Sequence, residues 1–213
     1  MKEKDCIFLV ADKQMEEAFK GFLGRNDFYL KLNVRPFTFD IIVEAGSDPG
    51  VYKRAHELLR LYQRTHRHAI VVLDEEWGSS PGAMKIEAAI NKNLTTNGWR
   101  EDDVVVIVIK PELEVWLWQD SPHIAKAFRF DHNPYPTLRK CLEAEGLWLS
   151  DHLKPARPKE AFEWVQRKSG LPRSGAIYNK ITANVSVRHC TDPAFFLLHQ
   201  TLQRWFPPDG VRR

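Results

Sequence analysis

Four runs rich in apolar residues divide the first half of the chain, and an amphipathic stretch follows each of them. The runs cover residues 6–11, 39–43, 69–73 and 104–109, and the last consists of six β-branched residues. Runs with so few polar breaks are typical of strands that are buried on both faces. Between them, apolar residues recur at the spacing of one helix face. This alternation predicts an α/β fold with a parallel sheet of about four strands flanked by helices.

The pattern changes after residue 120, because the remaining periodic stretches are helical. They cover residues 138–144, 159–168, 177–183 and 193–205, with connections rich in Pro and Gly. None of the runs in this half has the composition of a buried strand. We therefore predict an α/β domain over residues 1–120 and an all-helical extension over residues 121–213 that packs on it.

Composition narrows the class of protein without naming a function. The 213 residues are 43% hydrophobic and carry a formal charge of +3, which is ordinary for a globular protein and weaker than expected of a dedicated DNA binder. Cys6, Cys141 and Cys190 are far apart and form neither a metal motif nor a disulfide framework, which indicates a reducing compartment. The sequence has no apolar stretch of membrane-spanning length. We predict a cytoplasmic protein with no membrane partner.

Carboxylates follow every predicted strand. They are Asp12 after the first; Glu44 and Asp48 after the second; Asp74, Glu75 and Glu76 after the third; and Glu112 and Glu114 after the fourth. Because parallel strands end at one edge of a sheet, these side chains are expected to converge. Converging carboxylates repel unless a cation balances them, and Mg²⁺ prefers such oxygen ligands. Alternatively, Asp12, Asp48 or Glu112 simply caps a helix.

Several residues outside the strand ends have two interpretations. Lys159, Arg173 and Ser174 could contact phosphate, or they could be solvated loop residues. Glu112 and Glu114 are two apart, so we expect only Glu112 to face the site. Three smaller predictions concern structure alone: Trp116 and Trp118 pack in the core, residues 25–27 form a turn, and His66 and His68 lie in a solvated turn.

The acid after the first strand and the segment Asp74-Glu-Glu76 resemble a Toprim-type domain, found in topoisomerases, primases and nucleases of the overcoming-lysogenisation-defect type. The segment Pro111-Glu-Leu-Glu-Val-Trp-Leu-Trp118 resembles one in small Toprim-like proteins of bacterial mobile and defence loci. The whole chain is similar to a small component of methylation-associated anti-phage defence systems. The residues that carry this last similarity are Arg25–Phe28, Asp48–Tyr52 and Pro172–Tyr178.

The resemblance implies that Asp12, Asp74 and Glu76 are the catalytic residues, which hold Mg²⁺ for phosphodiester chemistry. The position of Glu112 beside the end of the fourth strand adds it as a fourth predicted metal ligand. The sequence departs from the Toprim pattern in having Asp12 where Glu is usual and Glu76 where a second Asp is usual. Two functions stay open. The first is a Mg²⁺-dependent nuclease or phosphodiesterase that acts on nucleic acid in anti-phage defence. The second is a non-catalytic subunit that binds a partner protein or nucleic acid in a defence complex. A sensor of a phosphorylated small molecule is a third alternative.

Overall fold

The computed structural model describes residues 4–119, 121–188 and 190–208. Four parallel strands form one sheet in the order β2-β1-β3-β4, which confirms the predicted fold class. The strands are β1 (Lys4–Val10), β2 (Phe39–Val43), β3 (His66–Asp74) and β4 (Val104–Ile109). Asp120, where we placed the boundary between the two halves, lies outside the described residues.

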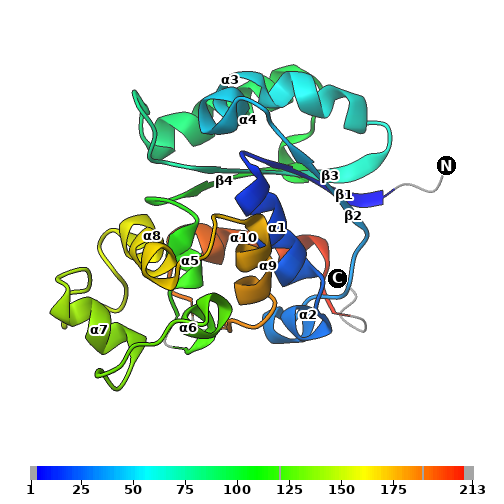
Figure 1. Ribbon diagram of the computed structural model, residues 1–213. Helices are drawn as coiled ribbons and strands as arrows, with labels where there is room; N and C mark the ends of the chain where they lie inside the picture. Colours follow the sequence, from blue (N-terminus) through cyan, green and yellow to red (C-terminus); the bar gives the residue numbers. More distant parts are fainter. Residues whose placement is uncertain (1–3, 120, 189, 209–213) are drawn as a thin grey trace.

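Helices cover both faces of the sheet (Figure 1). On one face lie α3 (Ser47–Leu59) and α4 (Ala83–Thr96), and on the other lie α1 (Lys13–Leu23) and α10 (Pro193–Trp205). The remaining helices extend the second layer: α2 (Asn26–Leu32), α5 (Glu114–Leu117), α6 (His123–Phe128), α7 (Leu138–Ala144), α8 (Pro158–Ser169) and α9 (Gly175–Thr182). Two 3₁₀ turns, η1 (Arg60–Tyr62) and η2 (Glu101–Asp103), lead into β3 and β4. None of the helices in the described ranges is both long and apolar enough to cross a membrane.

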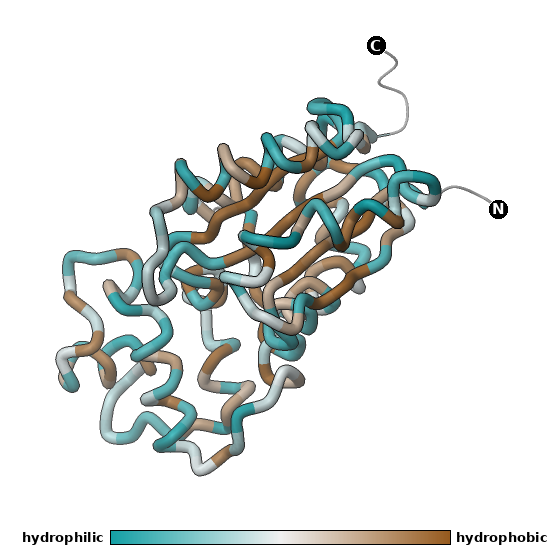
Figure 2. The backbone as a smooth tube through the Cα atoms, turned by 90° about the horizontal axis from the view of Figure 1, so that it is seen from above, coloured by the Kyte–Doolittle hydropathy of each residue, from teal (hydrophilic) through white to brown (hydrophobic). Residues whose placement is uncertain are grey.

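The apolar runs of β1, β3 and β4 form the centre of the core because both of their faces are covered, whereas the edge strand β2 is only partly buried. Residues 6–10 of β1 and 69–73 of β3 are fully buried. Seen from above, the strands are the hydrophobic centre of a chain whose outer helices alternate in polarity (Figure 2). One hydrophobic cluster includes side chains of the sheet and of both flanking layers, Cys6 among them. The strands therefore hold their carboxyl ends in fixed relative positions.

The C-terminal helices are fixed to the α/β half by close contacts. At Gly21 in α1, an added Cβ would overlap Thr182 Oγ1 and would lie 2.6 Å from the carbonyl oxygen of Asn179, so α9 can approach only a glycine here. Trp116 is fully buried and donates to Asp192 at 2.8 Å, while Trp118 donates to the carbonyl of Pro158 at 2.8 Å. The predicted packing role of both tryptophans is confirmed.

Two local predictions are wrong. Residues 25–27 are not a simple turn, because α2 begins at Asn26. His66 and His68 are not in a solvated turn. Both belong to β3 and are 4% exposed, since α10 and neighbouring strands cover them.

Residues 111–113 lie between β4 and α5, which begins at Glu114. The Pro111 carbonyl accepts the N–H groups of Glu75 and Glu76 and so ties this segment to the end of β3.

Candidate functional site

Five carboxylates lie together at the carboxyl ends of the strands. Asp74 ends β3, and the charges that act on it most strongly are those of Asp48, Glu114, Asp12 and Glu112. We call these five residues the acidic edge. The convergence expected from parallel strands is thus found for these five acids, at least one of which follows each strand, but not for Glu44, Glu75 or Glu76.

Asp74 is held at the centre of the acidic edge by backbone contacts. Its own N–H donates to Asp48 Oδ1 at 2.8 Å, and its Oδ1 accepts from the N–H of Leu113 at 2.9 Å. Burial, followed by the surrounding carboxylates, raises the pKa of Asp74 well above its usual value. Burial also raises the pKa of Asp48, although the N–H of Asp74 opposes that rise. The negative charge of the acidic edge thus exceeds the positive charge of the residues around it.

Asp12 and Asp48 have different local roles. Asp12 caps α1, because its Oδ1 accepts from the N–H of Met15 at 2.8 Å, and it also acts on Asp74 through its charge. The capping alternative is wrong for Asp48, since Gly46 is the N-cap of α3. Asp48 accepts instead from β3 and links the ends of two elements. Asp48 is not among the metal ligands predicted from the sequence, although it follows a strand like the other acids.

Glu112 and Glu114 are both buried, at 8% and 4% exposure, so the expectation that only Glu112 faces the site is wrong. Glu112 Oε2 accepts from Lys159 Nζ at 2.9 Å, and Glu114 Oε1 accepts from the Tyr178 hydroxyl at 2.6 Å. Burial raises the pKa of Glu114. Burial also raises the pKa of Tyr178, and the negative charge of Glu114 raises it further. Both glutamates can be buried because the single turn of α5 lies between α8, which supplies Lys159, and α9, which supplies Tyr178.

The three residues proposed for phosphate binding are placed differently. Lys159 belongs to the acidic edge through Glu112: burial alone would lower its pKa, but the charges of Glu112, Glu114 and Asp74 outweigh that effect and raise it. Arg173 is half-exposed, has a long ion pair with Glu163 at 3.8 Å, and acts electrostatically on Tyr178. Ser174 caps α9 by accepting from the N–H of Ala176 at 3.2 Å. Lys159 and Arg173 are therefore the cations near the site.

Glu76 is exposed and is not among the strongest influences on Asp74. Its neighbour Glu75 is directed to the start of α4, where Oε1 accepts from the N–H of Ala83 at 2.9 Å. Glu44 is buried and pairs with Arg54 at 3.4 Å. The structure thus brings together three of the four predicted metal ligands, Asp12, Asp74 and Glu112, and leaves Glu76 apart from them.

The donors of the acidic edge fit a hard cation in chemical type. Within the described ranges, no group of three or more His, Cys, Asp or Glu side chains could hold a metal ion as it stands. Mg²⁺ does not need one, because it commonly keeps several waters and binds one or two carboxylates plus substrate phosphates. Asp48 and Asp74 suit that role: each uses Oδ1 in the bonds above, and Oδ2 of each has no hydrogen-bond partner among the residues described.

Comparisons with known proteins gave no match to a family model, to a curated protein or to a solved structure. The Toprim-like resemblance therefore stays a prediction from the motifs quoted above.

Proposed function

We propose that the protein is a Mg²⁺-dependent phosphodiesterase or nuclease that acts on nucleic acid as a component of bacterial anti-phage defence. The observation that supports the chemistry is the position of Asp74 among four further carboxylates whose charges act on it, with Lys159 as the one ion-paired cation among the described residues of the site. A divalent cation would balance that charge. The defence setting rests on the family resemblance.

Asp74 and Asp48 would hold the ion, and Asp12 would add negative charge without leaving its cap on α1. Bound Mg²⁺ supplies electrophilic activation of the phosphate and a nucleophilic water at neutral pH. Lys159 is kept protonated by its carboxylate neighbours, so its charge faces the ligand site at any physiological pH. Arg173 is half-exposed and would contact a phosphate at the rim.

Calorimetric titration with Mg²⁺ and Mn²⁺ tests this function. Asp74→Asn keeps an acceptor for the N–H of Leu113 and removes the central charge, so the variant should fold and lose metal binding. Glu76→Gln is the matched control: it lies in the same segment, outside the acidic edge, and should bind metal like the wild type. Metal-dependent cleavage of DNA or RNA by the wild type but not by Asp74→Asn would then establish the activity. Equal loss in both variants would contradict the assignment of Asp74.

One observation favours a second function, a non-catalytic subunit that binds a partner protein or nucleic acid. Glu112 is already paired with Lys159, and the described carboxylates do not form a group of three around one point. If the wild type gives no heat with either metal, this second function becomes the better account. Fluorescence anisotropy with labelled single- and double-stranded DNA and RNA would then separate nucleic-acid binding from protein binding.

A further inference from the structure

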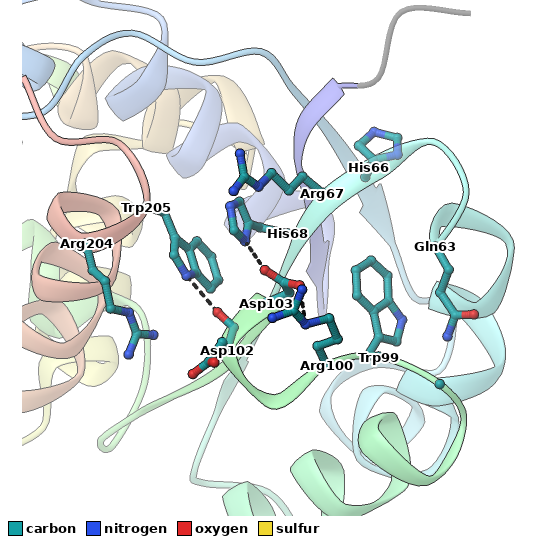
Figure 3. Close-up of a pocket in the computed structure, with 11 residues that line it drawn as sticks. Gln63, His66, Arg67, His68, Trp99, Arg100, Asp102, Asp103, Arg204 and Trp205 are labelled. Carbon is teal, nitrogen blue, oxygen red and sulfur yellow. Dashed lines mark hydrogen bonds and ion pairs between the residues drawn. The ribbon is translucent and has the colours of Figure 1, made fainter. Parts of the chain in front are cut away.

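A cavity of about 630 Å³ lies at the other end of the sheet from the acidic edge. Its walls come from the start of β3, from the segment leading into β4 and from the end of α10 (Figure 3). His68 and Asp74 are six residues apart on β3, so the two sites are separated by about 20 Å along the strand. The cavity is therefore independent of the chemistry proposed above.

Two buried polar atoms of this cavity lack a hydrogen-bond partner among the described residues: His68 Nδ1 and Trp99 Nε1. His68 is 4% exposed and Trp99 is 6% exposed. Asp103 Oδ1 lies 3.2 Å from His68 Nδ1, but the angles do not make a hydrogen bond. Folded proteins leave few buried polar atoms without a hydrogen-bond partner. Two such atoms in one cavity suggest that a ligand supplies the missing hydrogen bonds.

Positive charge surrounds the opening. Arg67, Arg100 and Arg204 line the cavity with two carboxylates, Asp102 and Asp103. Arg100 lies 3.6 Å from Asp103, whereas Arg67 and Arg204 have no carboxylate within ion-pair distance in the described part of the chain. Two guanidinium groups are thus available to an anion, and guanidinium matches the geometry of phosphate.

The wall between these arginines is flat and aromatic. His68 stacks on Trp205 with ring centroids 4.2 Å apart and planes 10° from parallel. Figure 3 shows Arg67 beside His68 and Arg204 beside Trp205, and the Arg204 guanidinium lies 5.9 Å from the centroid of that indole. Flat aromatic and guanidinium surfaces are those on which nucleobases stack. The volume is that of a small-molecule site and exceeds what a phosphate ion alone requires.

We propose that this cavity binds a nucleotide, with its phosphate on Arg67 and Arg204 and its base against the Trp205 wall, within reach of the Trp99 indole N–H. The ligand is either a free nucleotide or the phosphorylated end of an oligonucleotide, since both present the same groups. The acidic edge need not be catalytic for this site to operate.

Calorimetric titration of the full chain with the four ribonucleoside triphosphates, the four monophosphates and a 5′-phosphorylated tetranucleotide tests the proposal. We expect at least one to bind more tightly than about 1 mM. The paired change Arg67→Gln with Arg204→Gln should weaken that binding at least about tenfold, because two charge-assisted contacts are lost. Arg167→Gln is the matched control: it changes an exposed arginine of α8 that is not among the described residues lining the cavity, and it should leave the affinity unchanged.

A second measurement keeps the test decisive if the paired variant is unstable. Fluorine NMR of the wild type labelled with 5-fluorotryptophan should show the Trp99 and Trp205 signals shift on titration, with assignment by Trp→Phe variants. Preference for free nucleotide or for the oligonucleotide identifies the source of the ligand. Binding of inorganic phosphate with equal affinity, binding lost in Arg167→Gln but kept in the paired variant, or no binding by any probe would overturn the proposal.

Discussion

The burial of His68 predicts that the fold weakens in mild acid. Removal from water lowers the pKa of His68 from 6.5 to about 4, and the negative charge of Asp103 only partly opposes this. As the pH falls below about 6.5, the unfolded chain binds a proton at this residue that the folded chain does not bind. The contribution of neutral His68 to the unfolding free energy is therefore fully present above the pKa of the unfolded chain. It is lost as the pH falls towards the pKa of the folded chain.

The size of the effect follows from the two pKa values. A difference between 6.5 and about 4 corresponds to roughly 3 kcal/mol of unfolding free energy once the pH is below both values. At about pH 5 the unfolded chain is mostly protonated at this residue and the folded chain is not, which leaves a loss of roughly 2 kcal/mol. Because the ring is buried against Trp205, solvent screening reduces this figure little.

Urea unfolding of the wild type and of His68→Phe, from about pH 7.5 to about pH 5, measures the effect. Phenylalanine keeps a flat ring against Trp205 but cannot bind a proton, so the wild type should lose roughly 2 kcal/mol more than the variant over this range. His152→Asn removes a half-exposed histidine and should follow the wild type. Parallel pH profiles for the wild type and His68→Phe would refute the argument that His68 is buried in its neutral form.

Two further predictions concern the contacts between the sheet domain and the C-terminal helices. Gly21→Ala should lower the unfolding free energy by roughly 2 kcal/mol, because the new methyl group meets the backbone of α9. Gly78→Ala is the control: an added Cβ there has nothing within 4 Å, so the unfolding free energy should change little. Thermal unfolding of the two variants measures the difference. Asp192→Ala should cost roughly 2 kcal/mol, since it removes both the cap of α10 and the acceptor of the Trp116 indole N–H, and the emission of that tryptophan should change with it.

β1, β3 and β4 could be predicted because a strand that is buried on both faces consists of consecutive apolar residues. The edge strand β2 is only partly buried, but its short apolar run gave the same prediction. The convergence of Asp12 and Asp74 followed from the parallel direction of those strands. The direction of Glu76 could not be predicted in this way. Beyond the end of β3 the chain is positioned by the Pro111 carbonyl, which lies in a segment distant in sequence.

His66 and His68 show a second limit of sequence patterns. Three consecutive polar residues, His66 to His68, precede the apolar run, and such residues suggest a turn when their partners are unknown. In the fold, Asp40 contacts His66 and Trp205 covers His68, so β3 begins earlier than its apolar run. The cavity beside these residues escaped prediction for the same reason, because its walls come from separate segments that only the tertiary structure brings together.

Strand β3 carries His68 near its start and Asp74 at its end, so it fixes the distance between the nucleotide cavity and the acidic edge. Side chains alternate across a strand, so deleting or inserting one residue between them would turn one of the two sites to the opposite face of the sheet. Substitutions can therefore alter the residues of either site, but an insertion or deletion of one residue in β3 between them would separate the two sites onto opposite faces. The even spacing between His68 and Asp74, six positions along β3, is thus a constraint that any variant with both sites must keep.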